Sequence, residues 1–143
     1  HQLLAFFATL QRNRTIAIID DDLKFCNTLG DILQTRGYNV RKVTDSHMDV
    51  VDLTDDAQIV LLNLKINRID GQKIFQQIRA AHPDLPVLLI AGYRQEMDPA
   101  IQKAIQIGAH TCLYKPLELD ELLDTLAEIR LKTLRKELRN ADE

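Results

Sequence analysis

The sequence has only two cysteines in 143 residues, Cys26 and Cys112. They are too few to build a disulfide framework in a chain of this length, and they lack the spacing of metal ligands. We therefore expect both to be reduced thiols in the interior of the protein.

The sequence also lacks long apolar runs and an excess of positive charge. No stretch approaches the apolar length needed to cross a bilayer, and the opening segment has neither the basic start nor the cleavage pattern of a secretory signal. The formal net charge of −3 provides no basic field for a phosphate backbone. We therefore expect a cytoplasmic protein in which this domain binds neither membranes nor nucleic acid.

The pattern that remains is typical of one α/β domain, because 143 residues with 45% hydrophobic content suffice for a single core. Short apolar runs predict strands at 15–19, 38–43, 57–62, 86–90 and 111–114. Helical spacing of apolar residues predicts helices around 25–33, 46–53, 74–81 and 99–107, and a long helix from 119 onwards. This alternation predicts a parallel sheet with helices on both faces.

The two ends of the chain extend this pattern. Residues 1–14 are a predicted N-terminal extension or linker helix, and both the tail of an upstream helix and vector-derived sequence fit them. Residues 15–129 hold the predicted domain, and residues 130–143 a C-terminal helical extension. A short apolar stripe from Ala127 to Leu138 fits either a helix that meets a partner, including a homodimer, or a frayed end.

Polar side chains follow the predicted strands at one edge of the sheet. The carboxyl ends of the strands deliver Asp20, Asp21, Asn63, Ala91 and Lys115 to one crevice. Neighbouring carboxylates repel one another unless a cation compensates them. The two aspartates opposite the lysine therefore suggest a small site for a hydrated divalent cation.

These motifs, in this order, resemble the receiver domains of bacterial response regulators. The resemblance covers roughly residues 15–126 and rests on Asp20-Asp21-Asp22, Ile59 to Asn63, Ile69-Asp70-Gly71, Pro86 to Tyr93, Gly108-Ala109 and Leu113 to Pro116. It implies a flavodoxin-like, doubly wound five-stranded sheet in the order 2-1-3-4-5. It also implies Mg²⁺ binding and phosphoryl transfer from a histidine kinase to an aspartate. Kinases or other signalling partners would meet the face of the helix at 99–107, the last strand and the last helix.

The resemblance assigns roles to individual residues. Asp21 matches the direct metal ligand, Asp20 its water-mediated neighbour, and the backbone carbonyl of Lys65 a further ligand. Lys115 matches the lysine that holds a phosphoryl oxygen, and Pro116 the proline that follows a cis peptide bond.

Three positions depart from the family pattern. Asn63 stands where the phosphate-accepting aspartate would be, which is also a metal-ligand position, and a neutral amide cannot act as that nucleophile. Ala91 replaces the hydroxyl residue that reports phosphorylation, and Cys112 replaces an aromatic switch residue. We therefore expect a receiver-like module that is not an enzyme, binds Mg²⁺ weakly at most, and acts through protein contacts.

Several alternatives stay open. Position 63 could carry a substitution introduced into a phosphorylatable receiver, although this would not explain Ala91. A small flavodoxin-like nucleotide-binding enzyme would need a phosphate cradle after the first strand, where the sequence has three acids and no glycine-rich loop. Asp22 is most simply a helix N-cap, and Asp70 a turn residue rather than an alternative acceptor.

Overall fold

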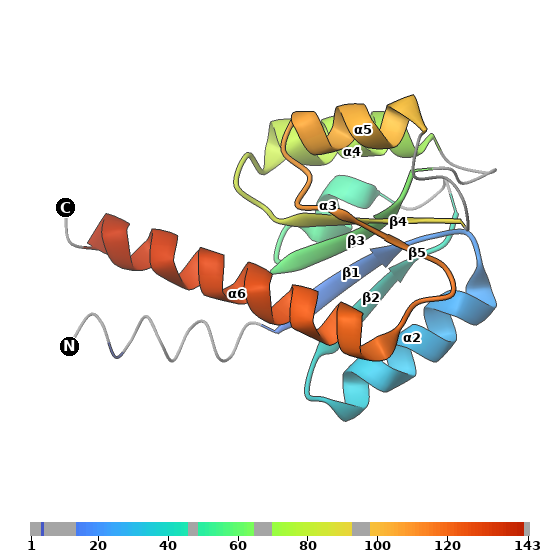
Figure 1. The fold of residues 1–143 in the computed structure, drawn as a ribbon, viewed down its shortest axis with the longest axis horizontal. Coiled ribbons are helices and arrows are strands. Elements are labelled where there is room, and N and C mark those ends of the chain that lie inside the picture. The colour runs from blue at the N-terminus through green and yellow to red at the C-terminus, as the bar shows by residue number, and fades with distance from the viewer. Residues whose placement is uncertain (1–3, 5–13, 46–48, 65–69, 93–97, 142–143) are drawn as a thin grey trace.

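The structure, a computed structural model, describes residues 4, 14–45, 49–64, 70–92 and 98–141. Its centre is a parallel five-stranded sheet in the order β2-β1-β3-β4-β5 (Figure 1). The strands are β1 (Thr15–Ile19), β2 (Asn39–Val43), β3 (Ile59–Asn63), β4 (Val87–Ala91) and β5 (Cys112–Tyr114). The predicted parallel direction and strand order are confirmed.

Helices cover both faces of this sheet, as predicted (Figure 1). One face carries α2 (Leu23–Thr35) and α6 (Leu119–Ala141), and the other carries α3 (Val50–Thr54), α4 (Gly71–Ala81) and α5 (Pro99–Gln106). The central strands β1, β3 and β4 are buried along their whole length. Strands that are covered on both faces need apolar side chains on both, which explains the continuous apolar runs in the sequence.

Aspartate side chains begin the four helices from α2 to α5. Asp22, Asp49, Asp70 and Asp98 each accept a hydrogen bond from a backbone N–H of the first turn of α2, α3, α4 and α5, respectively. Such caps satisfy N–H groups that have no partner within the helix. The prediction that Asp22 is an N-cap is confirmed, and Asp70 has the same role at α4.

Two elements, α3 and β4, begin later than predicted because of a helix cap and a proline, respectively. The helix predicted at 46–53 is α3, which begins at Val50 and ends at Thr54, while residues 46–48 lie outside the described part of the chain. Asp49 has extended backbone angles (φ −79°, ψ 102°) and caps α3, so it cannot belong to the helix. Pro86 precedes β4 instead of beginning it, because proline has no N–H to donate to the ladder.

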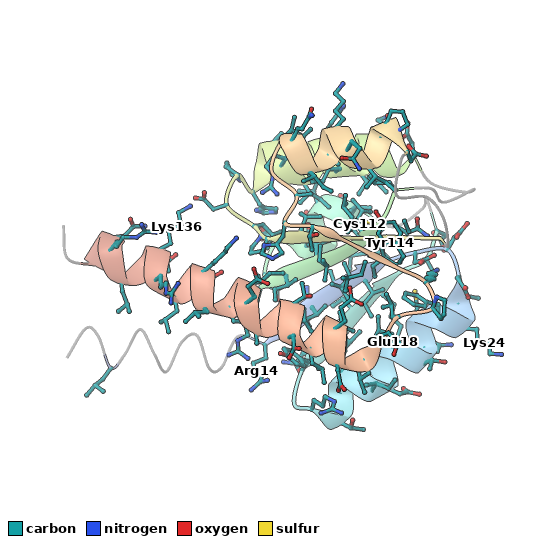
Figure 2. All side chains as sticks on the ribbon, in the orientation of Figure 1. Arg14, Lys24, Cys112, Tyr114, Glu118 and Lys136 are labelled. Atoms are coloured by element: carbon teal, nitrogen blue, oxygen red, sulfur yellow. The ribbon has the colours of Figure 1, made fainter. Side chains whose placement is uncertain are left out.

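The last helix extends beyond the sheet, as expected (Figure 1). Lys136 lies on its projecting part (Figure 2). It forms an ion pair of 2.5 Å with Asp84 in the loop before β4. α6 is continuous across residues 129 and 130, so the division of the chain there stays a prediction. Of the predicted N-terminal extension, only Leu4 and Arg14 are described. Within the described ranges, no helix is both long enough and apolar enough to cross a membrane.

Gly71 fixes the distance between α4 and the end of β3. A Cβ atom added at Gly71 would collide with the backbone of Leu64, the residue after Asn63. Gly30, in contrast, is also buried in a helix, but its nearest neighbour is the Cε atom of the flexible Lys42 side chain, 2.8 Å from an added Cβ.

We predict that Gly71→Ala destabilises the fold and that Gly30→Ala does not. The first change should lower the free energy of unfolding by about 1–3 kcal/mol, because the backbone at Leu64 must move to accept the methyl group. The second should leave this free energy unchanged or raise it by up to about 1 kcal/mol, because alanine favours a helix over glycine. Urea unfolding of both variants tests this, and equal losses would show that the close approach at Gly71 has no structural role.

Candidate functional site

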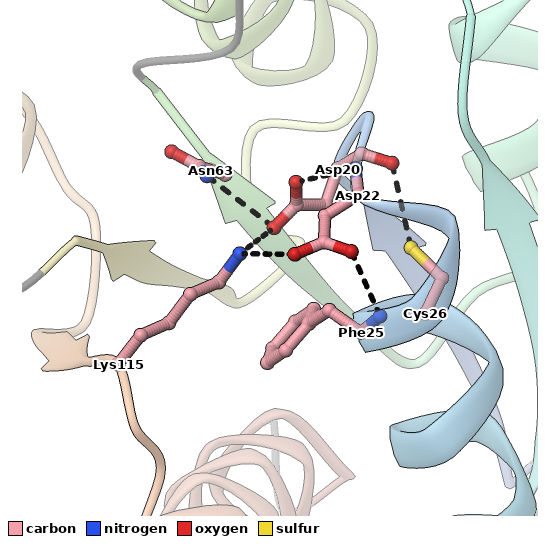
Figure 3. Close-up of polar contacts among 6 residues, drawn as sticks. All are labelled: Asp20, Asp22, Phe25, Cys26, Asn63 and Lys115. Atoms are coloured by element: carbon pink, nitrogen blue, oxygen red, sulfur yellow. Dashed lines mark hydrogen bonds and ion pairs between the residues drawn. The ribbon is translucent and has the colours of Figure 1, made fainter.

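The carboxyl ends of three strands bring Asp20, Asn63 and Lys115 together (Figure 3). Asp20 follows β1, Asn63 ends β3, and Lys115 follows β5. The lysine and the aspartate are 95 positions apart in the sequence. The sheet alone accounts for this convergence, because parallel strands end at the same edge.

Asp20 is the centre of the site and is only 1% exposed. Its Oδ2 atom accepts hydrogen bonds from the Lys115 ammonium at 2.7 Å and from the Asn63 amide nitrogen at 3.3 Å. Its Oδ1 atom accepts one from the backbone N–H of Asp22 at 3.0 Å. A buried carboxylate is costly unless it is paired and hydrogen-bonded, and here it is both.

The Lys115 ammonium is held from more than one side. Besides Asp20, it lies 3.9 Å from an Oδ2 atom of Asp22 and 4.0 Å from the ring centroid of Phe25. Its backbone N–H donates to the carbonyl oxygen of Ala91 at 2.8 Å. The Lys115-Pro116 peptide bond is cis, as predicted.

The amide of Asn63 directs its nitrogen, not its oxygen, at Asp20 (Figure 3). A carboxylate at this position could not donate that hydrogen bond and would instead place a second negative charge beside Asp20. Asparagine therefore turns a repulsive pair into an attractive one.

Cys26 in α2 and Cys112 in β5 are both buried. The Cys26 thiol donates to the backbone carbonyl oxygen of Asp20 at 3.4 Å. Burial raises the pKa of Cys26 to about 11, and the neighbouring negative charge of Asp20 adds to this effect. Burial likewise raises the pKa of Cys112 to about 11. Both thiols are free, as expected from the sequence.

Of the other predicted site residues, the structure describes Asp21 and Ala91 but not Lys65. Asp21 lies next to Asp20 and is half-buried, and Ala91 is buried at the end of β4. Lys65, whose carbonyl was a predicted ligand, lies outside the described residues. Sequence reasoning missed Phe25, because its helical spacing suggested only a core position. Its place in the first turn of α2, directly after the acids, was the available signal.

The described residues do not offer Mg²⁺ a suitable ligand set as they are arranged. Mg²⁺ requires oxygen ligands in a nearly octahedral arrangement. Two N–H donors already occupy Oδ2 of Asp20, and the Asn63 amide presents its nitrogen. Within the described ranges, no three acidic, histidine or cysteine side chains converge on a common point. The metal roles of Asp20, Asp21, Asn63 and the Lys65 carbonyl therefore stay predictions.

Comparison with known proteins identifies the family. Residues 16–127 match the family described as the response regulator receiver domain. This match spans most of the chain and includes Asp20, Asn63, Ala91 and Lys115. The chain therefore belongs to the receiver domains of two-component response regulators, and the resemblance inferred from its motifs is confirmed.

Curated relatives are longer proteins. The transcriptional regulatory protein ZraR of Escherichia coli K12 is 30% identical over 115 residues, which are 80% of this chain and 26% of that protein. The nitrogen assimilation regulatory protein NtrX of Azorhizobium caulinodans is 28% identical over 123 residues, or 84% of this chain and 26% of that protein. The chain thus spans about a quarter of the length of these relatives.

Solved structures agree with this assignment. NtrX from Brucella abortus, crystallised with ADP, superposes with a TM-score of 0.75 at 27% identity, covering 90% of this chain and 29% of that one. The isolated receiver domain of the same protein gives a TM-score of 0.69 at 29% identity, covering 82% of this chain and 98% of that one. The fold is that of a receiver.

We predict that neither cysteine reacts readily in the folded protein. Their pKa values, raised to about 11 by burial, keep both thiols protonated at neutral pH, and the thiolate is the reactive form. Iodoacetamide at neutral pH should therefore label the native protein slowly and the urea-unfolded protein at both positions, as measured by intact mass. Rapid labelling of the native protein at neutral pH would contradict the burial of these thiols.

Proposed function

We propose that this receiver domain does not accept a phosphoryl group at position 63 and acts through contacts with other proteins. The observation that carries the proposal is the hydrogen bond from the Asn63 amide nitrogen to Asp20. It supports a site in which the residue at position 63 forms a hydrogen bond within the protein instead of accepting a phosphoryl group.

The chemistry of the amide supports the same conclusion. Formation of an acyl phosphate needs a carboxylate oxygen as nucleophile. The carboxamide of Asn63 has no such oxygen, and its nitrogen is engaged with Asp20. Asp70 is not a convincing substitute, because its Oδ1 atom caps α4 at the backbone N–H of Lys73.

The second departure supports a domain without a phosphorylation-driven switch. Ala91 has no hydroxyl with which to bond a phosphoryl group, and it is buried at the end of β4. A ligand shifts a conformational equilibrium only through interactions that differ between the two states. We infer that this domain signals by binding other proteins and not by a change of conformation after phosphorylation.

Two surfaces suit such partners in our proposal. One is the face of α5, β5 and α6, where Ile107 is 48% exposed at the end of α5. The other is the projecting part of α6, where Leu131 is 46% exposed, which suits a homodimer or contact with a following domain. The partners would be a histidine kinase or other signalling proteins in the cytoplasm. The regulator names of the longer relatives favour a role in control of transcription, exerted by parts of the protein beyond this chain.

We predict that the protein gains no phosphoryl group from a small phosphodonor such as acetyl phosphate in the presence of Mg²⁺. Intact-mass spectrometry should show an unchanged mass, because position 63 has no carboxylate. A stoichiometric mass gain that is labile to alkali would overturn the proposal and would indicate Asp21 or Asp70 as the acceptor.

We also predict that Asn63→Asp restores phosphoryl acceptance without full switching. The variant regains a nucleophile, but the hydroxyl is still missing at Ala91, and one charge-assisted hydrogen bond contributes about 1.5–3 kcal/mol. Amide hydrogen exchange in α5 and β5 should therefore respond less to phosphodonor in Asn63→Asp than in the double variant that also carries Ala91→Thr. Equal responses of the single and double variants would show that the missing hydroxyl is irrelevant.

A further inference from the structure

We infer that the ammonium group of Lys115 is a built-in cation that takes the place of a divalent metal ion at Asp20, and that Phe25 holds it there. This inference rests on the proposed function, in which position 63 carries no negative charge. It makes the folded state independent of Mg²⁺ and assigns Phe25 a positioning role.

The charges around Asp20 require a cation of some kind. Asp20, Asp21 and Asp22 are consecutive, and Asp20 is 1% exposed, so little water reaches its carboxylate. Lys115 supplies the compensating charge at 2.7 Å from Oδ2, with its own side chain only 23% exposed. Among the described residues, Lys115, Asn63 and the backbone of Asp22 each donate an N–H hydrogen bond to the Asp20 carboxylate. The carboxylate is thus neutralised and hydrogen-bonded by the protein itself.

A metal ion that binds the Asp20 carboxylate directly would have to displace this arrangement. An ion bound to Oδ2 of Asp20 would meet the Lys115 ammonium on the same oxygen, and two cations at such a distance repel strongly in a site with little water. It would also meet the N–H group of Asn63, which is a donor and cannot be a ligand. Direct binding of Mg²⁺ to the Asp20 carboxylate therefore competes with Lys115.

Phe25 favours the lysine in this competition. The ammonium lies 4.0 Å from its ring centroid, within the range of a cation–π interaction. The ring is half-buried in the first turn of α2, which Asp22 caps through the backbone N–H of Phe25 at 3.0 Å. One short segment therefore supplies both an acid and an aromatic face to Lys115, while the Lys115 backbone is held by Ala91.

The test is the effect of Mg²⁺ on thermal unfolding. In wild type, millimolar Mg²⁺ should not change the unfolding midpoint beyond its general effect on ionic strength, which an equal ionic strength of NaCl reproduces. Lys115→Met leaves Asp20 without its cation, so this variant should unfold at a lower temperature. Mg²⁺ should then raise its midpoint by about 3–8 °C, because only the folded state offers the site.

Two matched variants separate this effect from a general loss of charge. Lys136→Met also removes an ion-paired lysine, but the pair with Asp84 is exposed, so no Mg²⁺ response should follow. Adding Asp20→Asn to Lys115→Met should abolish the Mg²⁺ response, because the buried charge is gone.

If Lys115→Met does not fold, Phe25→Leu provides the test, since it retains an apolar side chain and loses the aromatic ring that contacts the ammonium. It should show a Mg²⁺ response larger than that of wild type, because the ammonium is then held less firmly at Asp20.

The inference is overturned if Mg²⁺ stabilises wild type as much as Lys115→Met or Phe25→Leu. It is also overturned if neither variant gains a Mg²⁺ response. The unfolding measurements need no phosphodonor, so the two proposals can fail separately. A mass gain from phosphodonor would refute the proposed function. Stabilisation of wild type by Mg²⁺ with an unchanged mass would refute only the built-in cation.

Discussion

The structure of the site depends on one interaction, the buried ion pair between Asp20 and Lys115. It joins the end of β1 to the segment that follows β5, so it requires β3 and β4 to be in place between them. Breaking such a pair by removing one partner is costly, because the remaining charge stays buried. The sheet places Asn63 beside this pair, and its amide completes the hydrogen bonding of the same carboxylate.

The sequence predicts most of the fold because its signals are physical constraints on the backbone. Continuous apolar runs identify the buried strands β1, β3 and β4. The acids after β1 and the lysine after β5 identify the edge that carries the site. The start of α3 could not be predicted from spacing, because the cap at Asp49 decides it. The orientation of the Asn63 amide and the contact of Phe25 with Lys115 depend on side-chain rotamers, which a linear pattern does not encode.

Under the proposed function, Asn63 keeps the receiver fold while the chemistry of position 63 changes. An amide has nearly the shape of a carboxylate, so the packing at the end of β3 needs no rearrangement. A carboxylate at position 63 would repel Asp20, whereas the amide forms a hydrogen bond with it. A change at position 63 can thus remove phosphoryl acceptance without disturbing the packing at the end of β3.

The continuity of α6 has a mechanical consequence. The helix is 23 residues in one piece, and Leu122 and Leu126 in its first half are fully buried against the sheet. A helix of that length is about 34 Å long, so a tilt of about 5° at its start moves its far end by about 3 Å. A partner that shifts the packing of the first turns would move the end of the helix by a distance comparable to half a helical turn. Under the proposed function, a rigid α6 would thus carry a small change at the packed turns to a partner bound at its far end.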